Sequence, residues 1–149
     1  MMSNKPVELK KLTKSDAGKF QQTGQSMLKL ANGQEVVINI KSLGVNLQER
    51  LEDEWPYPEV PTIKRFNRQT QAWEYIPNEN DAEYQRKLKE VNTMRTYQIV
   101  LWGVDLDIEG ENFEEKVKTL IGSGFPVGAF SKLAEDIMKL SQVDQETFQ

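Results

Sequence analysis

Apolar and polar residues follow a different pattern in each part of this chain, and the changes in pattern predict its elements. Residues 1–25 are polar and rich in Lys, Gln, Thr, Ser and Gly, which favours a flexible arm. From Ser26 apolar residues dominate on both sides of Asn32-Gly33, a pair that favours a tight turn because both residues adopt positive φ readily. β-branched residues follow this turn, so we predict a β-hairpin over residues 26–40.

A short helix and a second hairpin are predicted next. Leucines spaced four apart at Leu43, Leu47 and Leu51 favour a helix that Ser42 could cap and that Pro56 must end. Residues 54–61 contain three prolines, so this stretch is expected to be an extended connector. Two short runs with apolar contacts then flank four polar residues, and they predict strands over 62–67 and 72–76 joined by a turn at 68–71.

The last half of the chain has the three-to-four spacing of amphipathic helices. A long helix is predicted from Asn80 or Asp81, whose side chains can accept hydrogen bonds from the first turn, to a stop at Gly103. Further helices are predicted over 111–121 and 127–141, and residues 140–149 lack periodicity and are expected to fray. Each helix has one apolar stripe, so the three are expected to pack as a small bundle.

These elements predict an α+β fold in which N-terminal β-hairpins precede a C-terminal bundle of about three helices. The expected organisation is a flexible arm over 1–25, a small hairpin-containing region over 26–76 and a helical bundle with a frayed C-terminus over 77–149. A chain of this length usually forms one domain.

The chain contains no histidine and no cysteine, which disfavours an enzyme because these residues most often transfer protons, act as thiol nucleophiles or bind transition metals. Residues 105–110 alternate oxygen ligands and end in glycine as a calcium loop does. The twelfth position of that loop is Lys116, where a carboxylate is needed. The glycines lack the spacing of a phosphate-binding loop. We therefore predict no catalytic, cofactor-binding or metal-binding residues, and a carboxylate-dependent enzyme is kept as an unfavoured alternative.

The charge and hydropathy of the chain argue against two classes of partner, nucleic acids and membranes. The net charge is -4 and the two signs are interleaved, so nucleic acid is not expected to bind. No apolar run is long enough to cross a bilayer, and the first residues do not resemble a secretory signal, so the protein is expected to be cytoplasmic and not to bind membranes.

Aromatic residues near prolines and in the second hairpin are the strongest candidates for contact with other proteins, because Trp and Tyr supply much of the binding energy at interfaces. The predicted partner-binding residues are Trp55, Tyr57, Trp73, Tyr75 and Phe125. The competing interpretation is burial in the core. It is favoured for Trp73 and for Phe130, whereas the proline setting of Trp55 and Tyr57 leaves both interpretations open.

One region resembles a known family. The proline-punctuated stretch 55–61, the acidic helix start at 77–84 and the amphipathic stretch 87–92 that leads to a helical end are similar to tail-region proteins of long-tailed bacteriophages, in particular the small tail assembly chaperones. The similarity extends from Trp55 to Trp102, about a third of the chain.

This resemblance implies a non-enzymatic, largely helical adaptor that coats the tape-measure protein and recruits tail-tube subunits in the cytoplasm of the host bacterium. The predicted 26–40 hairpin and the absence of a tape-measure signature keep a second hypothesis open, namely a structural virion protein of the tail or neck. Such a protein would use its hairpins to add strands to neighbours. A homo-oligomer is compatible with either hypothesis.

Overall fold

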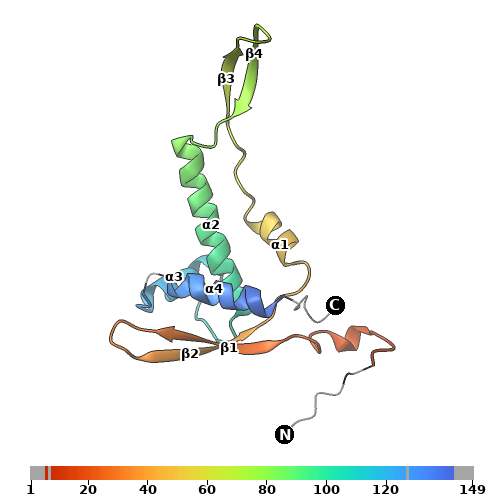
Figure 1. Ribbon diagram of the computed structural model, residues 1–149. Coiled ribbons are helices and arrows are strands. Elements are labelled where there is room, and N and C mark those ends of the chain that lie inside the picture. The colour runs from red at the N-terminus through yellow and green to blue at the C-terminus, as the bar shows by residue number, and fades with distance from the viewer. Residues whose placement is uncertain (1–5, 7, 127, 143–149) are drawn as a thin grey trace.

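The computed structural model describes residues 6, 8–126 and 128–142, and it is elongated (Figure 1). A base holds one hairpin and two helices, a long helix rises from it, and a second hairpin stands at the far end. The described elements, in chain order, are the 3-10 helix η1 (Lys14–Asp16), β1 (Thr23–Lys29), β2 (Glu35–Lys41), α1 (Leu47–Glu54), β3 (Thr62–Asn67), β4 (Ala72–Pro77), α2 (Ala82–Gly103), α3 (Phe113–Gly122) and α4 (Ala129–Leu140).

Strands β1 and β2 form the antiparallel hairpin predicted from the Asn32-Gly33 pair. Gly33 has a φ of 86°, as the pair predicts, whereas Asn32 does not adopt a positive φ. The Asn32 side chain instead accepts a hydrogen bond from the Gln34 amide at 2.9 Å, which stabilises the turn. Side chains alternate between the two faces of a strand. The face that carries Leu28 and Ile38 is buried, whereas Met27 is half exposed on the opposite face.

Helix α2 begins where its sequence predicts, because the Asp81 side chain accepts a hydrogen bond from the Tyr84 amide at 2.9 Å. At its other end Val104 is extended and forms an antiparallel bridge to Ile40, so the chain leaves α2 along the edge of β2. Helix α2 ends at Gly103, where the sequence predicts its stop. Helix α4 passes close to this residue, and a Cβ at this position would lie 2.5 Å from Ile137 Cγ2.

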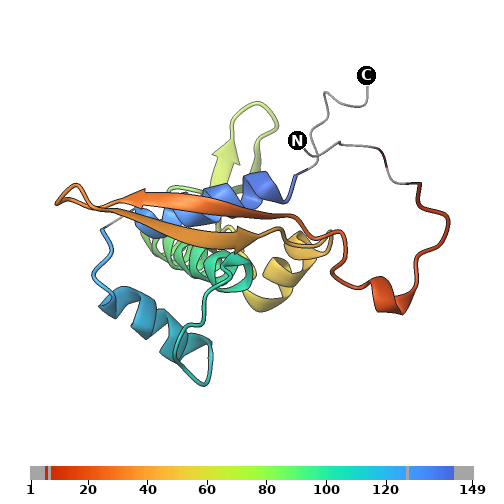
Figure 2. The same cartoon turned by 90° about the horizontal axis from the view of Figure 1, so that it is seen from below.

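Helix α4 lies between α2 and the β1–β2 hairpin and completes the core (Figures 1 and 2). The buried core residues come from β1, β2, the C-terminal end of α2 with the residue that follows it, α3 and α4. They are Leu28, Ile38, Ile40, Val100, Val104, Leu120, Ala129, Leu133, Ala134 and Ile137. The predicted α+β fold of hairpins followed by helices is confirmed. The core contains residues from both sides of the boundary predicted at residue 76.

Two element boundaries differ from the prediction. Strand β1 begins at Thr23, inside the stretch expected to be a flexible arm. Helix α1 begins at Leu47 after Asn46, not at Ser42. The Ser42 hydroxyl accepts a hydrogen bond from the Gln22 amide at 2.7 Å, so this side chain ties the end of β2 to the entry of β1 and is not free to cap a helix. Most of the predicted frayed end, 143–149, lies outside the described residues.

Among the helices of the described ranges, none combines the length and the apolar character needed to cross a bilayer.

Candidate protein-interaction surface

The second hairpin, β3–β4, projects from the rest of the molecule, and we call it the projecting hairpin (residues 62–77). Its register pairs Thr62 with Pro77 and Asn67 with Ala72. The Asn67 side chain accepts hydrogen bonds from the amides of Gln69 and Thr70, at 2.9 and 3.3 Å, which fixes the turn that the polar run predicts. Within the described part of the chain, β3 and β4 pack substantially only against each other.

One face of the projecting hairpin is aromatic and open to solvent. Phe66 and Trp73 lie opposite each other with their ring centroids 5.3 Å apart, and the Lys64 ammonium lies 5.1 Å from the Trp73 ring. Tyr75 lies on the same face, opposite Lys64. Trp73 is 60% exposed and Tyr75 is 71% exposed. The interpretation of Trp73 as a core residue is therefore wrong.

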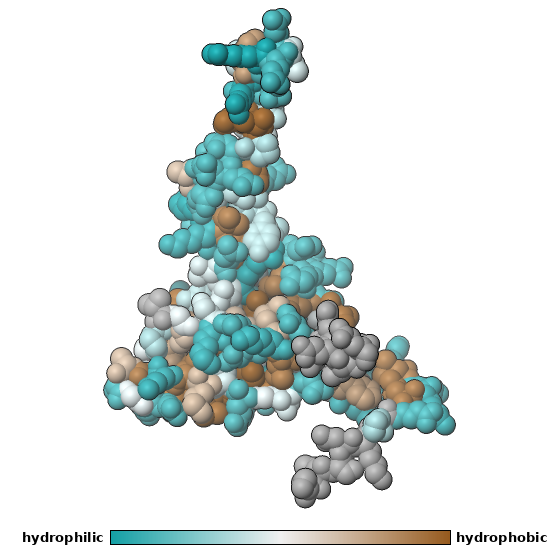
Figure 3. Space-filling view, in the orientation of Figure 1, coloured by the Kyte–Doolittle hydropathy of each residue, from teal (hydrophilic) through white to brown (hydrophobic). Residues whose placement is uncertain are grey.

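The other face and the charge of the projecting hairpin complete this surface. Ile63 and Ile76 pair near its base, where Figure 3 shows a hydrophobic band between more hydrophilic regions. The hairpin has three cations against the single carboxylate of Glu74, so its net charge is +2 on a chain whose total is -4. The cations are Lys64, Arg65 and Arg68. This combination of exposed rings and positive charge differs from the acidic remainder of the chain.

Trp55 fastens the proline-rich connector to α2. Its indole nitrogen donates a hydrogen bond to the Gln98 side chain at 3.1 Å, and its carbonyl accepts one from Arg95 Nε at 2.8 Å. Its ring lies 5.1 Å from that of Phe113 in α3. Trp55 thus contacts two helices and is partly buried, which also gives the connector a fixed position beside α2.

Tyr57 lies over the guanidinium of Arg95, with the Arg95 Cζ atom 3.7 Å from the ring centroid. Arg95 is 7% exposed, and among the described residues its Nη2 atom has no hydrogen-bond partner. The ring face of Tyr57 supplies a cation–π contact to this buried charge. Tyr57 itself is 53% exposed.

An apolar groove lies between α2 and α3, next to Trp55, and we call it the α2–α3 groove. It encloses about 670 Å³. Its apolar lining comes from the connector and both helices and consists of Trp55, Val91, Met94, Phe113 and Val117. Glu90, Glu114 and Lys118 also line it. The groove exists because α3 stands to the side of α2 and contacts it only slightly (Figure 2), so their apolar stripes do not cover each other.

Phe125 belongs to a separate aromatic cluster. Its ring lies edge-on to Phe130 with centroids 6.1 Å apart, and Phe130 lies 5.5 Å from Tyr97 of α2. Phe125 and Phe130 are partly buried and pack against the core. A smaller hollow of about 320 Å³ adjoins them.

The five predicted partner-binding residues therefore occupy three places. Trp73 and Tyr75 share the face of the projecting hairpin, Trp55 and Tyr57 lie on the connector, and Phe125 lies beside the core. Their role in binding stays a prediction. The groove residues of α2 and α3 belong to the apolar stripes that were expected to face the interior of a helical bundle. No feature of the sequence sets the angle between the two helices that leaves these residues open.

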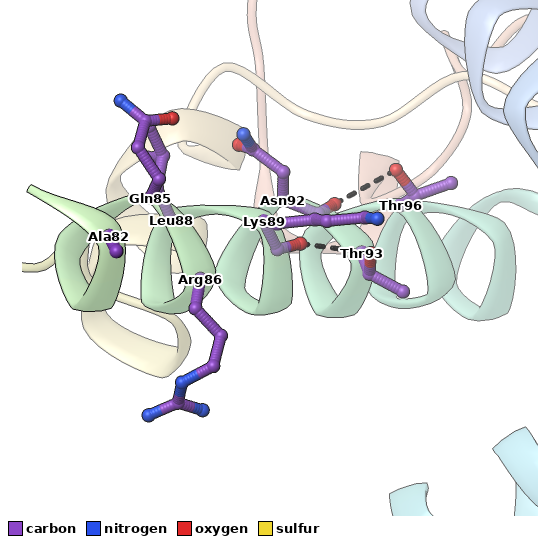
Figure 4. A pocket seen from close by; sticks show the side chains of 8 residues that line it. All are labelled: Ala82, Gln85, Arg86, Leu88, Lys89, Asn92, Thr93 and Thr96. Carbon is purple, nitrogen blue, oxygen red and sulfur yellow. Dashed lines mark hydrogen bonds between the residues drawn. The ribbon is translucent and has the colours of Figure 1, made fainter. Parts of the chain in front are cut away.

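A hollow of about 720 Å³ along α2 is not a convergent site. All its lining residues belong to α2, and Figure 4 shows that their side chains leave the helix in different directions. Two of its threonines, Thr93 and Thr96, donate hydrogen bonds to the carbonyls one turn earlier, of Lys89 and Asn92. The surface is thus an exposed helix face with internally satisfied hydroxyls.

Acidic residues do not converge into a metal site within the described ranges. In the stretch that resembles a calcium loop, the Glu109 carbonyl accepts a hydrogen bond from the Thr119 hydroxyl at 2.8 Å. Helix α3 is capped by Asn112, whose side chain accepts a hydrogen bond from the Glu115 amide at 2.9 Å, and not by an acidic residue of the 105–109 stretch.

Comparisons of the chain with models of protein families, with curated proteins and with solved structures found no match.

Proposed function

We propose that this chain is an adaptor that holds other proteins through its projecting hairpin and catalyses no reaction. The observation that carries the proposal is the aromatic face formed by Phe66, Trp73 and Tyr75, which is exposed on a hairpin without packing support from the other described elements. An isolated two-stranded hairpin is at best marginally stable in water, and exposed aromatic clusters are typical of binding sites. A bound partner would both cover the exposed rings and stabilise the hairpin.

In its specific form, the proposal is a tail assembly chaperone of a long-tailed bacteriophage. The support is the resemblance over Trp55 to Trp102, a region that contains the connector, the projecting hairpin and α2. The partners are then the tape-measure and tail-tube proteins, and the site of action is the cytoplasm of the host bacterium. The elongated shape in Figure 1 suits an adaptor, because it separates the hairpin from the base that holds the core.

Co-expression of this chain with the tape-measure protein or the tail-tube protein of the same phage tests the proposal. Each complex would be purified and its affinity measured by calorimetry. Replacing both rings, in Trp73→Ala/Tyr75→Ala, is expected to weaken binding by roughly a hundredfold or more, because truncating an interface Trp or Tyr commonly costs 2 kcal/mol or more.

Val45→Ala is the matched control, since Val45 is a fully exposed apolar residue outside the hairpin. This variant should bind like the unmodified chain. The adaptor role in its specific form would be refuted if the double variant bound as tightly as the unmodified chain. It would also be refuted if the unmodified chain bound neither phage protein.

A structural virion protein of the tail or neck is the second candidate. It is favoured by the fact that both described sheets are two-stranded hairpins, which can accept a further strand at their edges. Mass spectrometry of purified virions separates the two candidates, because a chaperone leaves the finished tail and a structural protein stays in the particle.

A further inference from the structure

The α2–α3 groove is a formed apolar surface whose walls are held in place. Trp55 is fixed by its hydrogen bond to Gln98 and by its contact with the Phe113 ring. Helix α3 is fixed at its start by the Asn112 cap, and Glu115 accepts a hydrogen bond from the Glu111 amide at 2.7 Å. The volume of about 670 Å³ lies within the range in which bound groups are commonly enclosed.

Two chain segments that lead to the walls of this groove carry a negative net charge. Residues 105–115, which include the first turn of α3, contain six carboxylates and no Lys or Arg. Helix α1, which ends at the residue before Trp55, adds Glu49, Glu52, Asp53 and Glu54 against the single cation Arg50. Glu90, Glu114 and Lys118 line the groove itself, and Glu90 accepts a hydrogen bond from Arg86 Nη1 at 2.7 Å. A ligand for this groove should therefore combine apolar or aromatic groups with positive charge.

The projecting hairpin of this same chain has that chemistry. Its exposed rings lie on a hairpin with a net charge of +2, and Lys64 already lies against the Trp73 ring. The hairpin cannot fill the groove of its own molecule. Its base is closed by a hydrogen bond from the Asn78 amide to the Pro61 carbonyl at 2.7 Å, and it points away from α3 at the opposite end of α2 (Figure 1).

We propose that the projecting hairpin of one copy docks in the α2–α3 groove of a second copy. The rings of Trp73 and Tyr75 enter the apolar lining, and the hairpin cations face Glu90 and Glu114. Since the two surfaces are different, the contact is head-to-tail, and repetition produces a ring or an open chain of copies. This self-association goes beyond the adaptor role and does not depend on it, because it involves no phage partner. It competes with any partner that binds the same rings.

The interface is small, so association should be weak and concentration-dependent. Sedimentation velocity over a concentration series is expected to show a rising average mass for the unmodified chain, and added salt should reduce it because the charges are exposed. Trp73→Ala/Tyr75→Ala damages the hairpin alone, and Val91→Arg damages the groove alone. Each variant by itself should associate at least roughly tenfold more weakly.

A mixture of the two variants is the decisive measurement. The hairpin variant keeps an intact groove and the groove variant keeps an intact hairpin, so the mixture should form a one-to-one pair that stops there. Should Val91→Arg fail to fold, the exposed double change Glu90→Lys/Glu114→Lys replaces it. Val45→Ala should associate like the unmodified chain.

Three outcomes would overturn the proposal. The unmodified chain could stay monomeric at all concentrations, which would leave the groove to a different protein. Both single-surface variants could associate as well as the unmodified chain. The mixture could fail to form the pair although both variants are folded. None of these outcomes bears on binding to the tape-measure or tail-tube protein, so the two proposals fail separately.

Discussion

At the scale of single residues, Asp136 joins α4 to strand β1, which lies 110 residues earlier in the sequence. Its carboxylate accepts a hydrogen bond from the buried Ser26 hydroxyl at 2.6 Å and one from the Lys132 ammonium at 2.9 Å. Partial burial acts to raise the pKa of Asp136, but these hydrogen bonds and the charges of Lys132 and Lys139 outweigh it and hold the pKa below the ordinary value of 3.8.

This lowered pKa predicts a pH dependence of stability. A carboxyl group whose pKa falls on folding stabilises the protein above its unfolded pKa and loses that contribution as the pH drops through the folded value. Asp136→Asn is expected to lower the free energy of unfolding by about 1 kcal/mol at neutral pH. The deficit should shrink as the pH falls below 3.8.

Urea titrations across this pH range measure the effect. Glu135→Gln is a suitable control, because Glu135 is an exposed neighbour that pairs only with Lys139 among the described residues. A constant difference between Asp136→Asn and the unmodified protein at every pH would contradict the assignment.

At the scale of elements, the two hairpins differ in how much they contribute to stability. The projecting hairpin supplies no residue to the described core, whereas β1 and β2 supply Leu28, Ile38 and Ile40. Replacing residues 63–76 by a short Gly-Ser turn should therefore leave the melting temperature within about 2 °C, the shift expected for less than 1 kcal/mol in a protein of this size. Leu28→Ala should cost about 2–5 kcal/mol.

Calorimetry of the shortened chain and of the Leu28→Ala variant compares the two hairpins directly. A fall of many degrees in the shortened chain would mean that the projecting hairpin packs on the body in solution.

Local signals in the sequence explain which elements could be predicted. Asn32-Gly33 and Asp81 act on their immediate neighbours, and both set the boundaries that the pattern indicates. Ser42 has an equally good local signal for a helix cap, but a tertiary contact with Gln22 uses its hydroxyl. The position of Gly103 beside Ile137 and the exposure of Trp73 likewise depend on residues remote in the sequence, so periodicity could not reveal them.

At the scale of the whole molecule, the projecting hairpin and α2 extend the protein well beyond a compact shape (Figure 1). A compact domain of this length has a radius of gyration of about 15 Å. Small-angle X-ray scattering extrapolated to low concentration, where copies separate, should give a larger value. The radius of gyration of the shortened chain should be closer to that of a compact domain. A value of about 15 Å for the unmodified protein would show that the hairpin folds back onto the body.

The hydrogen bond between Ser26 and Asp136 joins positions separated by 110 residues, and α4 covers the buried face of β1. Translation therefore produces Leu28 and Ile38 long before the helix that shields them leaves the ribosome. Until then the nascent chain exposes an apolar strand pair, so final folding is delayed until residues 129–140 emerge.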